Sequence, residues 1–267
     1  MENNRWQRML VIVSLILSGE AIFTLPYHVT RFFRPTFLEV FDLSATELGV
    51  AQSAYGFAAM VAYFFGGPLA DRFEPRKPLA GSLWATALGG LYLATFPSVA
   101  GVTLVWGFFG LTNILFFYAA LIKATRSWGG DTQQGLAYGL LDGGRGLLAA
   151  VLASVGVFAF SVAFPLGYDA ATLPQKAEVL RQVIYGYTAV TAAVGFVVWF
   201  TLRGLDGEQT GEQSAPISHF FRQIKHVIRL RVVWLQSTVL ICAYTSYKAF
   251  DQYALFAVRG HGIDEVD

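Results

Sequence analysis

Charged residues are scarce in this chain of 267 residues: 14% are Asp, Glu, Lys or Arg, against 55% that are hydrophobic. So few charged side chains cannot cover the surface of a soluble domain of this length. The net charge is only +1, which excludes the strongly basic surface typical of nucleic-acid binding, and no nucleic-acid partner is expected. The composition therefore predicts a protein whose main surroundings are a lipid bilayer.

Motifs for catalysis, cofactors and metals are also missing. The single cysteine, Cys242, excludes a disulfide framework, and its place in an apolar run predicts a small buried residue. The chain has no Walker loop, no HExxH and no paired CxxC, so ATP hydrolysis, a cofactor and a metal site are not expected. An enzyme is not predicted.

Long apolar runs are what the chain does have. A helix needs about 20 apolar residues to cross the hydrocarbon layer, and the runs 48–70, 146–168 and 182–202 reach that length without a charge. Residues 78–122 contain no charged residue and are interrupted only by TFPSVAG, which predicts a turn between two spans. Residues 9–30 and 232–258 add two spans that tolerate charge. We predict an all-α polytopic membrane protein with seven spans.

The distribution of Lys and Arg predicts the orientation. With the N-terminus on the cytoplasmic side, the inner loops carry more basic residues than the outer ones. The inner residues are Arg5, Arg8, Arg72, Arg76, Lys77, Lys123, Arg126, Arg203, Arg222, Lys225, Arg229 and Arg231. The outer residues are Arg31, Arg34, Lys176, Arg181 and Arg259. The first apolar segment lacks a signal-peptide cleavage pattern and is expected to remain as a span of a multi-pass inner-membrane protein.

A change of composition divides the chain into three parts. Residues 1–203 hold six spans, residues 204–231 begin polar and Gly-rich and become basic and amphipathic, and residues 232–267 hold one further span. The middle part predicts a cytoplasmic linker with a helix at the membrane surface. Six spans, a linker and a seventh span are the layout of a transporter built from two six-helix halves. On that layout the chain is expected to be a fragment of a 12-helix protein.

The stretch GGPLADRFEPRK lies in the inner loop between the second and third predicted spans. It contains a glycine, then Asp-Arg after three further residues, and then a basic pair: Gly67, Asp71, Arg72, Arg76 and Lys77. In this pattern the chain resembles the major facilitator superfamily, and the resemblance implies that the loop is a conformational latch. Gly67 is expected to allow close helix approach, and Asp71 to cap a helix or pair with a basic side chain. A loop selected only for positive charge would explain the Arg and Lys residues alone.

Two further features resemble the organophosphate and organic anion branches of the superfamily. Glu74 and Pro75 stand before the final basic pair, where the commonest form has glycine. His28 and Arg31 lie near the outer end of the first span, about where organophosphate antiporters carry a substrate-binding arginine. The alternative is that Arg31 and Arg34 are interfacial anchors among aromatic neighbours.

Ionisable residues inside the spans are the best candidates for function, because each is costly in the bilayer. Asp142 and Arg145 are three residues apart on the fifth helix, and Lys248 and Asp251 have the same spacing on the seventh. Either pair can simply neutralise itself, and the glycines around the first predict tight packing against a neighbour: Gly135, Gly139, Gly143 and Gly146. Glu20 is left without a cationic partner, so it is expected to be neutral at rest and a candidate proton carrier, unless a cation outside this chain pairs with it.

The expected function is secondary active transport of a small anionic organic solute by alternating access, with a proton as a candidate coupling ion. The expected binding residues are Lys248, Arg145, Arg31, His28, Tyr244 and Asn113, and the proton-coupling candidates are Glu20 and Asp142. For Asn113 a helix contact is the alternative, since a buried amide requires a partner. A transporter-like membrane sensor is the alternative function, and the protein is expected to be a monomer.

Overall fold

The computed structural model of the protein describes residues 2–70, 72–164, 171–205, 227–249, 253, 256, 257 and 260. All regular structure in these residues is helical, which confirms the all-α prediction. The first half contains α1 (Glu2–Phe23), the π-helical η1 (Thr24–His28), α2 (Val29–Phe32), α3 (Arg34–Val40), α4 (Ala45–Ala70) and α5 (Arg76–Leu93). The second contains α6 (Val99–Leu111), the π-helical η2 (Thr112–Tyr118), α7 (Ala119–Gly129), α8 (Gln134–Ala163), α9 (Leu173–Thr201), η4 (Leu202–Leu205) and α11 (Arg231–Ala249).

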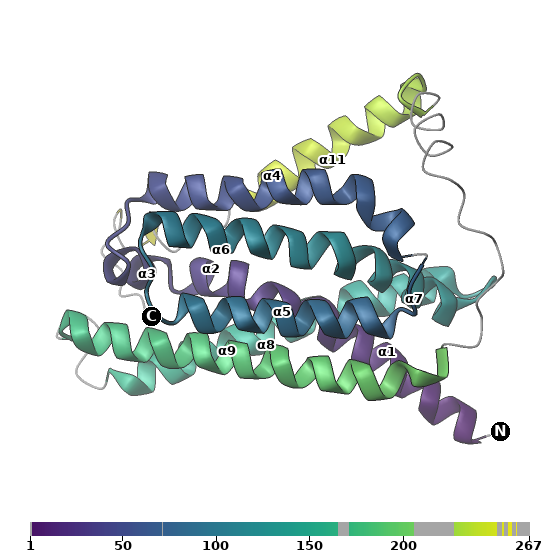
Figure 1. Ribbon diagram of the computed structural model, residues 1–267, viewed down its shortest axis with the longest axis horizontal. Coiled ribbons are helices and arrows are strands. Elements are labelled where there is room, and N and C mark those ends of the chain that lie inside the picture. The colour runs from purple at the N-terminus through teal and green to yellow at the C-terminus, as the bar shows by residue number, and fades with distance from the viewer. Residues whose placement is uncertain are drawn as a thin grey trace.

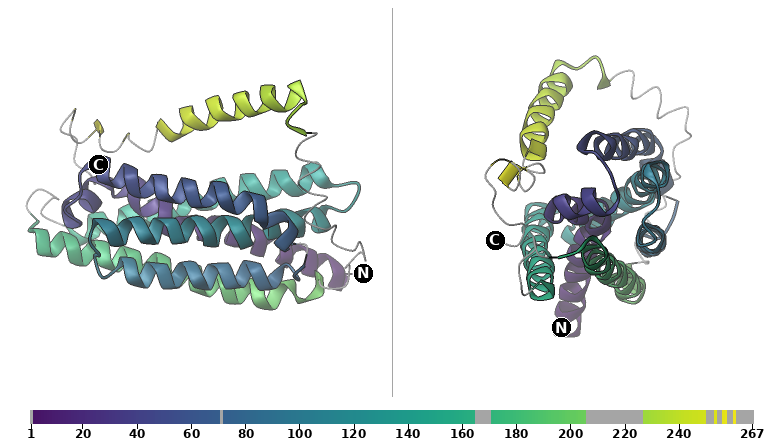
Figure 2. Two further views of the ribbon diagram at one scale, coloured as in Figure 1. Left: turned by 45° about the horizontal axis from the view of Figure 1, so that its top comes forward. Right: turned by 90° about the vertical axis from the view of Figure 1, so that its left-hand side faces the viewer.

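The helices up to α9 form one bundle. Figure 1 shows α4, α6, α5 and α9 running side by side along its long axis, and the most extensive helix packing joins α4 to α6 and α5 to α9. The first helix packs against α8 and α9, so the first predicted span contacts the fifth and the sixth. Figure 2 shows α11 standing off this bundle.

Among the described residues, five helices are long and apolar enough to cross a membrane: Arg5–Phe32, Ala45–Ala70, Val99–Gly129, Gln134–Ala163 and Leu173–Thr201. The other two predicted spans are helices as well, α5 and α11, but shorter or more polar. α5 has 18 residues and starts with Arg76 and Lys77, so its apolar part is short, although one face of it packs closely against α9. The turn predicted between the third and fourth spans lies between Leu93 and Val99.

The sixth span begins nine residues before its predicted start at residue 182. The reason is local, since Thr172 forms a capping box with Gln175 and Pro174 lies in the first turn. One turn later, Lys176 Nζ lies 3.0 Å from Glu39 Oε2, which ties α9 to α3. The polar first turns of α9 are therefore helical although they are not apolar.

Two packing predictions find no contact within the described residues. A Cβ atom on Gly135, Gly139, Gly143 or Gly146 would meet nothing within 4 Å, so this face of α8 is open in the described residues. The close glycine contacts on α8 are those of Gly144 against Ile16 and of Gly156 against Tyr187 and Phe33. Gly67 is likewise open, and the close approach is at Gly66, whose Cβ would lie 3.0 Å from the Leu115 carbonyl oxygen. The glycines predicted from the spacing, such as Gly67 and Gly143, thus stand next to the glycines that make close contacts, Gly66 and Gly144.

Cys242 is exposed on α11, not buried as its apolar surroundings predicted. The surface of α11 that the structure describes is almost entirely exposed, because this helix makes few contacts with the bundle. The predicted linker comprises residues 204–231, of which 206–226 lie outside the described residues.

Candidate functional site

A π-helical turn in the first span brings Glu20 and His28 together. Eight residues are about 2.2 turns of α-helix, so the two side chains would point about 80° apart around a regular helix. The segment Thr24–His28 is π-helical, with a wider turn that takes up one extra residue. Glu20 and His28 therefore lie on one face, about two turns apart, and His28 leans back toward the helix N-terminus.

His28 Nε2 lies 2.9 Å from Glu20 Oε1. Both residues are buried, and His28 Nδ1 has no hydrogen-bond partner among the described residues. We assign the proton of a neutral imidazole to Nε2, which donates to the carboxylate and leaves Nδ1 as an unpaired acceptor.

Arg145 approaches this pair from α8. Its side chain crosses Gly19, where a Cβ atom would lie 2.8 Å from Arg145 Cδ, so only glycine leaves room for it. Arg145 Nε lies 3.5 Å from Glu20 Oε2, and the terminal NH1 lies 3.5 Å from Asp142 Oδ1. The guanidinium also stands 5.4 Å above the ring of Phe23. One cation thus connects two acids on different helices.

The prediction that Glu20 lacks a cationic partner is wrong, because Arg145 reaches it from α8. The intrahelical pair of Asp142 and Arg145 is confirmed, but Arg145 also pairs with Glu20. The side chain of Glu20 is 9% exposed and that of Asp142 is 73% exposed. Of the two acids, Glu20 is the one whose charge the protein must balance internally.

Asn113 donates to the carbonyl group of Ile22, which stands four residues before Pro26. In an α-helix the Ile22 carbonyl accepts from the N–H of residue 26, and proline has none. Asn113 Nδ2 donates to the Ile22 oxygen at 3.2 Å, while Asn113 Oδ1 accepts from Thr86 and Thr112 at 3.2 Å each. Asn113 is completely buried. Of the two expectations for Asn113, these contacts favour the helix contact.

Replacing Asn113 with Leu is therefore expected to lower the free energy of unfolding by about 1–3 kcal/mol, because the Ile22 carbonyl becomes an unpaired buried acceptor. The loss should be smaller when Pro26→Ala is also present, since an alanine at this position supplies the missing N–H. Denaturant unfolding of both single variants and the double variant measures this coupling. Ser53→Ala, which removes a hydroxyl that bonds only within its own helix, is the control. Equal losses in both backgrounds would contradict the pairing.

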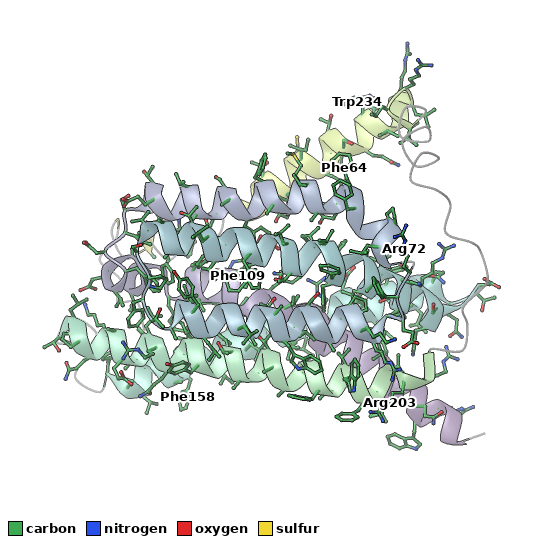
Figure 3. The ribbon with its side chains drawn as sticks, viewed as in Figure 1. Phe64, Arg72, Phe109, Phe158, Arg203 and Trp234 are labelled. Carbon is green, nitrogen blue, oxygen red and sulfur yellow. The ribbon has the colours of Figure 1, made fainter. Side chains whose placement is uncertain are left out.

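The predicted latch residues lie at the end of the bundle where α4 and α5 meet. Asp71 lies outside the described residues, and Arg72 is exposed; Figure 3 shows Arg72 and Arg203 at the same end of the bundle. Glu74 accepts from Arg76 at 3.0 Å and lies 3.3 Å from Lys77 Nζ. The hydrogen bond from Arg76, and to a lesser degree Lys77, lowers the pKa of Glu74. Glu74 is not part of the major facilitator pattern, but its ion pairs hold the side chains of Arg76 and Lys77 in place.

The remaining predicted binding residues lie on α2 and α11. Arg31 lies half-buried in the last turn of α2, and Tyr244 is exposed on α11. The Lys248 side chain and Asp251 lie outside the described residues. Arg34 is not an interfacial anchor, because it is only 1% exposed and belongs to the core of α3. The aromatic residues around Arg34 suggested a position at the membrane interface and gave no indication that this cation is buried.

The fold and the cluster together define a class: a polytopic helical membrane protein with ionisable side chains between its helices. The sequence matches the family model of the Major Facilitator Superfamily over residues 9–265, and the chain belongs to that family. Its members are membrane transporters and not enzymes. No solved structure matches the chain.

The proteins that are similar to the chain include two from Escherichia coli strain K12. The inner membrane protein YqcE is 26% identical over 266 residues, which cover 100% of this chain and 60% of YqcE. The inner membrane protein YihN is 28% identical over 236 residues, which cover 87% of this chain and 53% of YihN. The chain thus spans little more than half the length of these relatives. Their membrane location agrees with the predicted multi-pass membrane protein.

Proposed function

We propose that the protein moves a small anionic organic solute across the inner membrane by alternating access, in exchange for or together with a proton. The observation that carries the proposal is the position of Arg145, an arginine inside the span region that two acids hold only loosely. Both of its ion-pair distances are 3.5 Å, whereas a charge-assisted hydrogen bond between nitrogen and oxygen is about 2.7–2.9 Å. Its Nε atom makes no hydrogen bond with the described residues.

A loosely held guanidinium is suited to a carboxylate, sulfonate or phosphate. Its planar set of N–H groups can give such an anion two parallel hydrogen bonds. The Arg145 side chain is 23% exposed, so it is accessible from one side while Glu20 approaches it from the other. A neutral sugar or an amine would gain no comparable contact. Anionic solutes are therefore the proposed substrate class.

Glu20 links the anion to a proton in this proposal. An ionised Glu20 competes with the solute for Arg145 and repels the solute's own charge. When Glu20 takes a proton, Arg145 loses one of its two counter-ions and becomes free to bind an anion. Proton binding and anion binding then support each other, so the affinity for the anion should rise as the pH falls.

Two parts of the proposal rest on the sequence. Lys248 on α11 is proposed as a second cation facing the solute, since the first and seventh helices of this family face each other across the cavity. Asp71 and its neighbours are proposed as the latch, with the N-terminus in the cytoplasm. On this view Asp71→Asn should leave insertion intact and strongly reduce transport.

Uptake by the full-length protein in liposomes tests the function. We expect glycerol 3-phosphate, gluconate or ethanesulfonate to be taken up or exchanged, with a dependence on an imposed pH gradient, and glucose not to be. Liposomes without protein and liposomes with Arg145→Gln provide the background. Uptake of glucose but of none of the anions would contradict the substrate class. Binding of an anion without any transport would instead support the membrane sensor.

A further inference from the structure

A groove of about 520 Å³ runs along the outside of the bundle between α5 and the α6–η2 helix. From α5 it is lined by Lys77, Gly81, Ser82 and Ala85, and from the facing helix by Phe108 and Phe116, among others. Both phenylalanines are exposed, and Gly81 has open space in front of it. From Lys77 to Ala85 the groove extends about 12 Å along α5, which is close to half the thickness of a bilayer's hydrocarbon core. Its volume is typical of a small-molecule site, and its length along α5 is close to the thickness of one leaflet of the bilayer.

Positive charge lies at the end of the groove where the bundle reaches the 71–75 turn. The ammonium group of Lys77 is at this mouth, and its side chain is 51% exposed. Arg76 and Lys77 share the carboxylate of Glu74, at 3.0 Å and 3.3 Å. Residues 71–77 contain three basic and two acidic side chains in all, so the sequence carries a net positive charge at this end of the groove. This arrangement suits an anionic group at the mouth with a hydrocarbon chain below it.

Ser82 gives the groove a polar point one turn deeper than its mouth. It is 4% exposed, lines the groove, and its hydroxyl has no hydrogen-bond partner within the described part of the chain. A buried hydroxyl without a partner is unfavourable. An oxygen-bearing ligand would supply the missing acceptor, whereas a purely hydrocarbon ligand would not.

We propose that this groove binds an anionic phospholipid, with its phosphate at Lys77, an ester oxygen at Ser82 and one acyl chain between Phe108 and Phe116. Each feature of the groove matches one part of that molecule in the order in which they occur along α5. The site lies on the outside of the bundle and is separate from the cluster around Arg145. It does not depend on which solute the protein moves.

Photolabelling tests the proposal in liposomes that contain the full-length protein. Phosphatidylglycerol and phosphatidylcholine are each prepared with a diazirine on one acyl chain, and the labelled peptides are identified by mass spectrometry. We expect phosphatidylglycerol to label residues 77–85 and 108–116 about fivefold more than phosphatidylcholine, the effect of one basic residue near the membrane surface. Lys77→Gln should abolish this preference, and Gly81→Trp should remove most labelling by both lipids.

Two variants serve as matched controls. Arg126→Gln removes an exposed basic residue of α7 that does not line the groove, and Leu88→Trp places the same large ring on an exposed position of α5 outside the groove. Both should label like the unchanged protein. Equal labelling by the two lipids, labelling that Gly81→Trp leaves unchanged, or no labelling of these segments would each overturn the proposal. The last outcome would mean that a protein surface covers the groove.

Discussion

Replacement of Arg145 by Gln is expected to weaken the binding of an anionic solute by about two orders of magnitude or more. The variant removes the guanidinium that would give the anion two charge-assisted hydrogen bonds, each contributing about 1.5–3 kcal/mol. A tenfold change in affinity corresponds to about 1.4 kcal/mol, so two such bonds account for the effect. Isothermal titration of the purified full-length protein with glycerol 3-phosphate, gluconate and ethanesulfonate measures it.

Arg145→Lys and Arg126→Gln show whether charge alone explains the loss. The lysine variant keeps a cation but not the planar pair of donors, so its affinity should lie between those of the unchanged protein and Arg145→Gln. Arg126→Gln removes an exposed cation far along the chain and should bind normally. Thermal unfolding of each sample reports folding separately. Normal anion affinity in Arg145→Gln would contradict the proposed role, and so would a fall in stability without a fall in affinity.

Gly19→Ala moves the guanidinium without removing it. The added methyl group would stand 2.8 Å from Arg145 Cδ, which the flexible side chain can relieve only by shifting. We expect a severalfold weaker affinity for the anion and little change in folding. Gly107→Ala, where a Cβ atom would meet nothing within 4 Å, is the matched control.

Most of the bundle was predictable because the bilayer allows few solutions for a spanning chain. Apolar runs of about 20 residues and the turn at TFPSVAG located helices whose positions the structure confirms. Helix ends were less predictable. The capping box at Thr172 extends α9 into polar sequence that a search for apolar runs leaves out.

The ion cluster could be predicted only as separate parts. Asp142 and Arg145 share a helix face by simple spacing, and the sequence shows this. The contact between Glu20 and His28 depends on a π-helical turn, and an α-helical wheel places these residues on different faces. Pro26 was the available signal, because a proline inside a span disturbs the helix and frees a carbonyl group. The contact of Arg145 with Glu20 joins the fifth span to the first, which no local pattern specifies.

The glycine pattern of α8 did not predict which glycines make contacts, for a related reason. Spacing showed that α8 carries a row of small residues, but not which of them meets a neighbour within this chain. Gly144, which does, stands beside the predicted row, and Gly19 is important only because Arg145 crosses it. Small residues permit close contact, and the partner's position decides where contact occurs.

Replacement of Glu20 by Gln is expected to separate anion binding from proton coupling. Gln has the shape of a protonated glutamate and can still accept a hydrogen bond from His28 Nε2, which lies 2.9 Å from the carboxylate in the unchanged protein. It cannot take or release a proton, and it no longer acts as a counter-ion for Arg145. Anion affinity at high pH should therefore rise to the level that the unchanged protein reaches only at low pH, and it should no longer vary with pH.

Transport measurements should separate anion binding from proton coupling in the same way. Glu20→Gln should lose accumulation driven by a pH gradient, because no proton crosses with the solute, but should keep exchange of labelled for unlabelled anion, which needs no net proton movement. Asp142→Asn is the comparison, since Asp142 contacts the same arginine but its side chain is 73% exposed. It should retain gradient-driven uptake. If Asp142→Asn loses that uptake and Glu20→Gln keeps it, Asp142 is the coupling residue. A Glu20→Gln variant whose anion affinity falls at every pH would show that Glu20 holds Arg145 in position and that its proton is not the switch.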